Sequence, residues 1–319
     1  MRSVARARCP LGLMFHRFRA EESRAWPQGA MTPGQLERLL RFVGIERILS
    51  PAAWLERLDR GTLSDDDRCL TFDDGLRSQM QYALPVLEHL GLQAFWFVST
   101  SVFHGQPIKG ELYSHAAARM GGMPVLIGAF LEACPAEVLA TLRSDAFSQY
   151  TTELLRTSPY YSAADLQYRF IRNFILDASG FGTTMDAVLR ARGEDPNDGS
   201  GVWLDETDVA RLSSTGHMVG LHSWSHPYAL ALLTPERQRD EYARNQADLA
   251  AIVGAPPTTM SHPVNSYSAV TLDLLRELGV RHGFRADTDA GLSGRVNGDP
   301  LELAREDAAN VLAEMGETA

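Results

Sequence analysis

The sequence predicts an α/β fold, a distorted parallel (β/α) TIM-like barrel with a helical insertion. Two observations predict it. Short apolar runs, typical of buried strands, alternate with helical patterns along the chain. Polar and ionisable residues collect directly after several of these runs, and a parallel barrel builds its active site at the ends of its strands. The 319 residues, 45% of them hydrophobic, are sufficient for one such domain.

Eight apolar runs are the predicted strands. They are residues 11–15, 47–49, 69–72, 94–98, 218–221, 259–261, 282–285 and 301–304. Helices are expected where a polar cap or a proline precedes a helical pattern and a glycine follows it. Such signals are Thr32-Pro33, Asp205 with Gly216, Thr234-Pro235 with Gly254, and Ser268 with Gly279.

A long segment separates the run at 94–98 from the run at 218–221. Its pattern is mostly helical, at residues 114–133, 135–144, 147–158, 163–178 and 183–192. One crossover between parallel strands does not need so many helices. We therefore expect a single barrel domain over residues 1–319, with a helical subdomain inserted at about 104–200.

Composition excludes several classes of function. The net charge is −10 and no block of Lys and Arg occurs, so nucleic acid is not an expected partner. No apolar stretch approaches the ~18 residues of a membrane span, and the apolar stretch near the N-terminus is too short for a signal peptide. The cysteines, Cys9, Cys69 and Cys134, are odd in number and are expected to be buried free thiols. These observations predict a cytoplasmic, soluble protein.

Two motifs carry the expected chemistry. Asp73 and Asp74 follow one apolar run, and His222 and His226 follow another. Pro227 disfavours a helix at the histidine pair, which is therefore expected on a strand-to-loop turn. Two imidazoles and one carboxylate are a typical ligand set for a hydrolytic metal ion. Because the side chains of neighbouring residues diverge, one aspartate is expected to bind the metal and the other to act as a base.

Further polar residues are expected on the same rim of the barrel. His16 follows the first predicted strand, and His262 follows the run at 259–261. Arg305, Glu306 and Asp307 follow the last run. This convergence is stronger evidence for an active site than either motif alone.

The motifs resemble those of the polysaccharide deacetylase (NodB-homology) superfamily. The matching stretches are Thr71-Phe72-Asp73-Asp74-Gly75, His222-Ser223-Trp224-Ser225-His226-Pro227 and, less specifically, Phe15-His16-Arg17. The resemblance spans about residues 11–100 and 200–310. It implies a distorted barrel that uses a divalent metal, with zinc expected, to remove acetyl groups from sugars. It also implies that Asp73 is the general base and that Asp74, His222 and His226 hold the metal.

Two positions depart from the family pattern. Where the superfamily usually has an arginine that pairs with the base, this chain has Ser261. Arg305 is our candidate to orient Asp73 instead. Where relatives carry a histidine near the C-terminus, this chain has Ala308. His262 is the expected catalytic acid in its place, with His16 the other available imidazole.

The expected substrate is an N-acetylated sugar. We assign His16, Trp224, Arg305 and Asp307 to substrate binding. A cytoplasmic deacetylase would act on a nucleotide- or lipid-linked precursor of a surface polysaccharide such as O-antigen. One alternative is a deformylase or cyclic-amide hydrolase on the same scaffold. The other is a non-catalytic, metal-retaining sugar-binding protein, which Ser261 and Ala308 favour and the intact Asp73 opposes.

Overall fold

The structure is a computed structural model, and it describes residues 9–23, 26–27, 29–157, 161–286 and 298–318. The chain forms two compact units. The first comprises Met1–Ser23, Gly29–Ile108 and Ser200–Ala319, and the second comprises Arg24–Gln28 and Lys109–Gly199.

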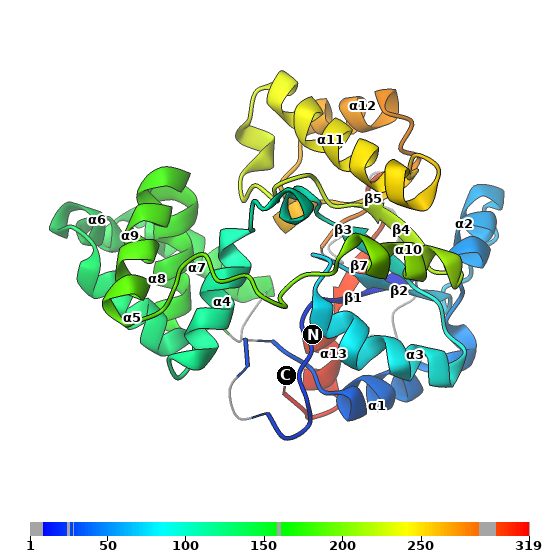
Figure 1. The fold of residues 1–319 in the computed structure, drawn as a ribbon, viewed down its shortest axis with the longest axis horizontal. Helices are drawn as coiled ribbons and strands as arrows, with labels where there is room; N and C mark the ends of the chain where they lie inside the picture. Colours follow the sequence, from blue (N-terminus) through cyan, green and yellow to red (C-terminus); the bar gives the residue numbers. More distant parts are fainter. Residues whose placement is uncertain (1–8, 24–25, 28, 158–160, 287–297, 319) are drawn as a thin grey trace. The chain divides into compact units, whose positions relative to one another are not determined.

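The first unit contains a sheet of seven parallel strands in the order β6-β5-β4-β3-β2-β1-β7 (Figure 1). The strands are β1 Leu11–Phe15, β2 Arg68–Phe72, β3 Phe95–Val98, β4 Met218–Leu221, β5 Thr259–Ser261, β6 His282–Phe284 and β7 Arg305–Asp307. A parallel bridge joins Phe284, at the end of β6, to Leu303, just before β7. This bridge nearly closes the sheet, and the predicted distorted barrel is confirmed.

Two predicted strands were wrong. Residues 45–47 form a short 3-10 helix, and Ile48 pairs with Arg68 only through an isolated bridge. The last strand pairs at Arg305–Asp307 rather than at residues 301–304. Leu301, Leu303 and Ala304 are apolar and buried, but burial alone does not decide which backbone groups pair.

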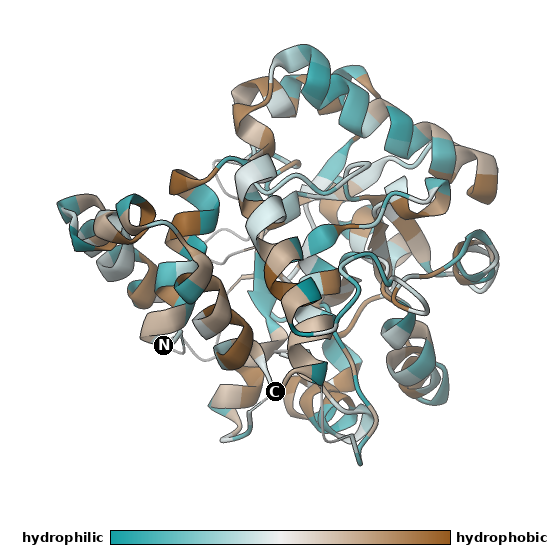
Figure 2. Ribbon diagram, turned by 60° about the vertical axis from the view of Figure 1, so that its left-hand side comes forward, coloured by the Kyte–Doolittle hydropathy of each residue, from teal (hydrophilic) through white to brown (hydrophobic). Residues whose placement is uncertain are grey.

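Seven helices of this unit surround the sheet among the described residues. They are α1 Pro33–Val43, α2 Pro51–Arg60, α3 Leu84–Leu90, α10 Glu206–Ser214, α11 Pro235–Val253, α12 Ala269–Glu277 and α13 Ala308–Glu314. The predicted starts of α1, α10, α11 and α12 are confirmed, with Thr32, Asp205, Thr234 and Ser268 at the N-caps. Hydrophilic and hydrophobic residues both occur along the helices, as expected of helices that cover a buried sheet (Figure 2).

The strands are buried on both faces, as a parallel barrel requires. Leu70 and Phe72 of β2 join the large cluster of apolar side chains, in which the Phe72 ring stacks on Trp96 at 4.5 Å. Cys69 of β2 points the other way and joins a smaller cluster with Phe95 of β3. None of the three cysteines, all of which the structure describes, forms a disulfide, and Cys9 is only partly buried, unlike Cys69 and Cys134.

The second unit is helical and has a hydrophobic core of its own. Its helices are α4 Lys109–Arg119, α5 Met123–Ala133, α6 Ala136–Ala140, α7 Asp145–Thr157, α8 Ala163–Phe170 and α9 Ala178–Ala191. The single helix predicted at 114–133 is broken, because Gly121 and Gly122 adopt φ of 103° and 110°, which a helix cannot contain. Within the described part of the chain, no single helix is long and apolar enough to cross a membrane, although the bent pair Met123–Ala133 and Ala136–Arg143 passes that test together.

Candidate metal-binding and catalytic site

The candidate site lies at the carboxyl ends of the central strands of the barrel. Asp73 and Asp74 follow β2, His222 follows β4, and His16 follows β1. The carboxyl ends of parallel strands meet at one rim, so these residues approach one another although they are far apart in the sequence. His16, Asp73 and His222 each directly follow the last residue of a strand, so the strands fix where these side chains start.

The three predicted metal ligands lie together. Asp74 Oδ1 is 3.3 Å from His222 Nε2 and 3.4 Å from His226 Nε2. The candidate ligand atoms of the three residues all lie within 4.8 Å of one another. Two imidazole nitrogens and a carboxylate oxygen suit zinc, and they leave a coordination position open for water or substrate. The residues present therefore fit the expected divalent ion.

The backbone around these ligands is strained. Asp74 and His226 adopt φ of 73° and 54°, and Ser223, between the two histidines, adopts 59°. Non-glycine residues in this left-handed region cost about 1–3 kcal/mol each and are concentrated at functional sites. The strain is consistent with a loop shaped to aim its side chains.

Helix α11 holds the histidine loop in this shape. The Glu241 carboxylate accepts hydrogen bonds from Ser225 N at 2.8 Å and Ser225 Oγ at 2.6 Å. Asn245 accepts from His222 N at 3.0 Å and donates to Val98 O at 2.9 Å, so it ties the end of β4 to the end of β3. Asn245 follows the buried Tyr242 by one turn, so it is a polar residue on the inward face of the helix. Sequence reasoning missed this signal.

Arg305 makes a buried ion pair with Asp73. Its Nη1 and Nη2 atoms each lie 2.8 Å from one carboxylate oxygen of Asp73. The Arg305 side chain is fully buried, and the backbone carbonyl of Arg285 and the hydroxyl of Thr71 accept two more of its hydrogen bonds. The structure therefore brings Arg305 to the position expected of it, as the group that orients Asp73.

Gly12 makes room for this arginine. It pairs with Arg305 across β1 and β7. A Cβ atom at Gly12 would lie 3.0 Å from Arg305 Cγ and 3.3 Å from the Phe284 ring. Because both neighbours are packed inside the barrel, a side chain at Gly12 would displace the arginine from Asp73.

The charges around the site keep both aspartates ionised. Burial is the largest single influence and would raise the pKa of Asp73, but Arg305, His222 and His16 together outweigh it and leave that pKa below its ordinary value. Burial also opposes ionisation of Asp74, but hydrogen bonding and charge from His222 and His226 hold its pKa well below the usual range. In the absence of metal, burial would lower the pKa of His222, but Asp73 and Asp74 raise it above 6.5.

Comparison with known proteins agrees with this geometry. Residues 190–283 match the family model for polysaccharide deacetylase. This segment, less than a third of the chain, is therefore similar to that family. A chitin deacetylase from Pestalotiopsis sp is 32% identical over 108 residues, which cover 34% of this chain and 35% of that protein. The alignment therefore spans about a third of the length of this relative.

Solved deacetylase structures share the fold. Streptococcus pyogenes deacetylase PplD, in complex with acetate, has a TM-score of 0.55 and 15% identity, with 94% of this chain and 92% of that chain covered. IcaB from Ammonifex degensii has a TM-score of 0.51 and 16% identity, with coverage of 94% and 91%. A de-N-acetylase from Aggregatibacter actinomycetemcomitans has a TM-score of 0.51 and 13% identity, with coverage of 94% and 95%.

The two candidate acids, His262 and His16, have different surroundings. His262 is 1% exposed, its ring stacks on Tyr267 at 4.0 Å, and its Nε2 lies 2.8 Å from Leu301 O. Burial lowers the pKa of His262 to about 3, so the ring is neutral near pH 7. The His16 side chain is 34% exposed, and its Nε2 lies 3.9 Å from Asp73 Oδ2.

Two other expected substrate-binding residues have contacts of their own. Trp224 lies on the loop between the metal-ligand histidines, and the guanidinium of Arg244 lies 5.2 Å from its ring centroid. The Asp307 carboxylate accepts a hydrogen bond from Ala309 N at 2.8 Å and caps α13. Ala308 is buried at the first position of this helix.

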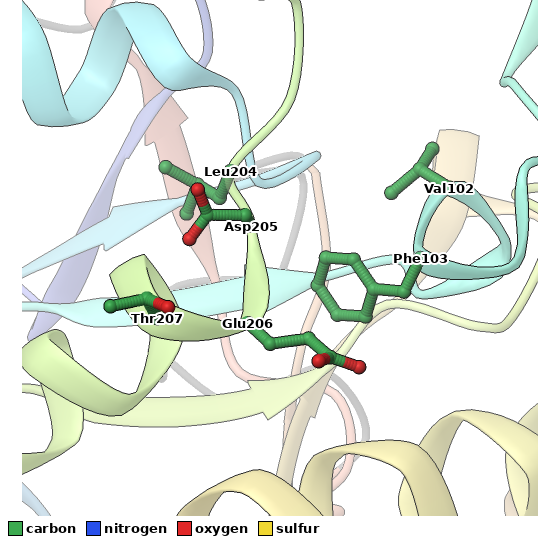
Figure 3. Close-up of a pocket in the computed structure, with 6 residues that line it drawn as sticks. All are labelled: Val102, Phe103, Leu204, Asp205, Glu206 and Thr207. Carbon is green, nitrogen blue, oxygen red and sulfur yellow. The ribbon is translucent and has the colours of Figure 1, made fainter.

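An open pocket of about 470 Å³ adjoins the loop of the aspartates. It is lined by Val102, Phe103, Leu204, Asp205, Glu206 and Thr207 (Figure 3). Leu204 N donates to the carbonyl of Gly75, the residue after Asp74, at 2.9 Å. The side chains of Phe103 and Glu206 lie beside one another in Figure 3, but none of the candidate metal ligands lines this pocket.

Proposed function

We propose that the protein is a metal-dependent hydrolase that removes the N-acetyl group from an amino sugar. The observation that carries the proposal is the ionised, arginine-paired carboxylate of Asp73, which directly precedes a metal ligand. A binding site for metal or sugar has no need of a buried base at this place. The family match and the chitin deacetylase relative support a carbohydrate substrate.

Asp74, His222 and His226 would hold the ion, with zinc expected. When bound there, a divalent ion would polarise the acetyl carbonyl and acidify a water molecule. His222 and His226 would offer Nε2, the nitrogen that faces Asp74 in each case. The low pKa of Asp74 keeps this third ligand ionised over the whole neutral range.

Asp73 accepts the proton of the attacking water. Its carboxylate is ionised at neutral pH because Arg305 stabilises the charge. Arg305 binds both carboxylate oxygens, so it also fixes the plane of the carboxylate. A positioned base of this kind typically contributes ~10²–10⁴-fold to the rate.

The leaving amine needs a proton, and the geometry favours His16 over His262 as its donor. His262 is enclosed, its Nε2 faces a backbone carbonyl, and its low pKa leaves it without a proton to give. His16 is partly exposed and lies beside Asp73. A proton accepted by Asp73 can therefore return to His16 after His16 has protonated the amine.

For the substrate itself, we propose a nucleotide- or lipid-linked N-acetylated sugar. This choice rests on the predicted cytoplasmic location, and it would place the reaction in the synthesis of a surface polysaccharide such as O-antigen. The name of the similar chitin deacetylase supports an N-acetylated sugar as the unit that is recognised.

Acetate release tests the proposal. The metal-loaded protein is incubated with N-acetylated nucleotide sugars and with N-acetylated oligosaccharides, and acetate and formate are measured. We expect acetate from at least one class and none from the same reactions with Asp73→Asn. Formate in place of acetate would indicate the deformylase alternative. Stoichiometric metal and sugar binding without any hydrolysis would favour the non-catalytic protein.

A further inference from the structure

Ser261 lies between the base and a metal ligand. It is the last residue of β5 and is fully buried. Its Oγ atom is 3.0 Å from Asp73 Oδ1 and 2.7 Å from His222 Nδ1. One hydroxyl group therefore touches both residues, which come from different strands.

The direction of both hydrogen bonds follows from the charge on Asp73. An ionised carboxylate can only accept, so the Ser261 hydroxyl must donate its proton to Asp73. The oxygen of Ser261 is then an acceptor toward His222, and Nδ1 of His222 must carry the hydrogen. The backbone carbonyl of Ser261, at 3.1 Å from Nδ1, requires the same assignment.

This arrangement fixes the tautomer of His222. With hydrogen on Nδ1, the lone pair is on Nε2, which is the nitrogen that faces Asp74 and the proposed metal position. A hydrogen-bond acceptor behind a ligand imidazole also makes that imidazole a stronger ligand. Here the acceptor is the Ser261 hydroxyl group, which itself donates a hydrogen bond to the carboxylate of Asp73. The negative charge of Asp73 therefore polarises the His222 imidazole through this hydroxyl group.

We propose that Ser261 is a positioning residue that couples the base Asp73 to the metal ligand His222. Its hydroxyl orients the carboxylate, together with Arg305, and polarises the imidazole. The kinetic part of this inference rests on the proposed hydrolytic function, whereas the part that concerns metal affinity does not.

The test compares metal affinity and kinetics in matched variants. Zinc affinity is measured by competition with a chelator, and kcat and KM are measured on the best N-acetylated substrate. Ser261→Ala removes the hydroxyl, and Ser261→Thr retains it. Ser99→Ala is the control, because Ser99 is also fully buried at a strand end but donates to the backbone carbonyl of His222, at 2.9 Å, rather than to the base.

We expect Ser261→Ala to weaken zinc binding and to lower kcat by about 10-fold or more, the lower limit for residues that support a metal ligand. KM should change little, because the hydroxyl contacts no exposed surface. Ser261→Thr should recover most of both losses, and Ser99→Ala should show neither. If Ser261→Ala behaves like Ser99→Ala, or if Ser261→Thr is no better than Ser261→Ala, the inference is wrong.

A double-mutant cycle isolates the coupling. Zinc affinity is measured for the wild type, Ser261→Ala, Asp73→Asn and the double variant. We expect removal of the Asp73 charge to weaken zinc binding less when the hydroxyl is already absent, so the two effects will not add. Additive effects would overturn the inference. Failure of the proposed function would instead appear as a wild-type protein that releases no acetate, and the cycle would still decide the role of Ser261.

Discussion

Asp73 and Asp74 are neighbours in the sequence, but their side chains face different partners. Asp74 faces the two imidazoles, and Asp73 faces Arg305. The two residues are of the same type, but their different surroundings suit Asp74 to the proposed role of metal ligand and Asp73 to the proposed role of base.

The substitution Asp73→Asn tests whether Asp73 is the base and Asp74 the metal ligand. Asp73→Asn keeps the shape of the side chain but removes its ability to accept a proton. At saturating zinc, where weaker binding does not empty the site, we expect turnover to fall by ~10²–10⁴-fold while one equivalent of metal remains bound, measured as acetate release and elemental content. Asp74→Asn is the matched variant and should lose the metal. If Asp73→Asn lost the metal and Asp74→Asn kept it, the two roles would be exchanged.

The ion pair of Arg305 with Asp73 predicts a second result. Arg305→Met leaves a buried carboxylate without its partner, so we expect a loss of ~3–5 kcal/mol in the free energy of unfolding, measured by urea denaturation. The same substitution in an Asp73→Asn background should lower the free energy of unfolding less, because no charge is then left unpaired. An equal loss of free energy in both backgrounds would show that the arginine stabilises the barrel independently of Asp73.

At the scale of elements, α11 supports the loop of His222 and His226, the proposed metal ligands. Asn245→Leu would leave His222 N and Val98 O buried without partners, at a cost of about 1–3 kcal/mol for each group. We expect weaker metal binding and a lower melting temperature. Gln246→Ala is the control, because the Gln246 amide donates only to the carbonyls of Pro257 and Leu278, away from the site. Equal losses of metal affinity in both variants would contradict the role given to Asn245.

The elements differ in how well the sequence predicts them. The strand Met218–Leu221 was predicted with the observed bounds, because it is a short apolar run between His217 and His222. Thr259–Ser261 was also predicted with the observed bounds, although only Met260 in it is apolar. Residues 301–304 were predicted as a strand because three of the four are apolar, but the neighbouring Arg305 pairs with β1 instead. A fully buried arginine in a strand contradicts the usual pattern, and only the three-dimensional position of Asp73 explains it.

The candidate site, like the fold, could be predicted only in part from the sequence. Which residues reach the rim follows from strand order, so Asp73, Asp74, His222 and His226 could be named from their motifs. The link through Ser261 depends on side-chain directions at the ends of three strands, β2, β4 and β5, and no sequence pattern encodes it. The enclosure of His262 likewise depends on Tyr267, which lies on a loop that sequence reasoning left unassigned.

At the scale of the whole molecule, the two units have separate hydrophobic cores. Replacement of Lys109–Gly199 by a short linker should therefore leave a folded barrel that still binds metal. Circular dichroism and metal content measure this outcome, and the full-length protein is the reference. An unfolded or metal-free product would show that the helical unit is needed for the barrel to fold.

The central claim is that this chain hydrolyses an N-acetyl sugar with one metal ion at Asp74, His222 and His226. Titration of the metal-free protein with zinc, followed by acetate release at each step, tests it most directly. We predict that activity rises linearly to a sharp end point at one equivalent of zinc, and that His222→Ala neither binds zinc at that stoichiometry nor releases acetate. Full activity in the metal-free protein, or unchanged activity in His222→Ala, would contradict the claim.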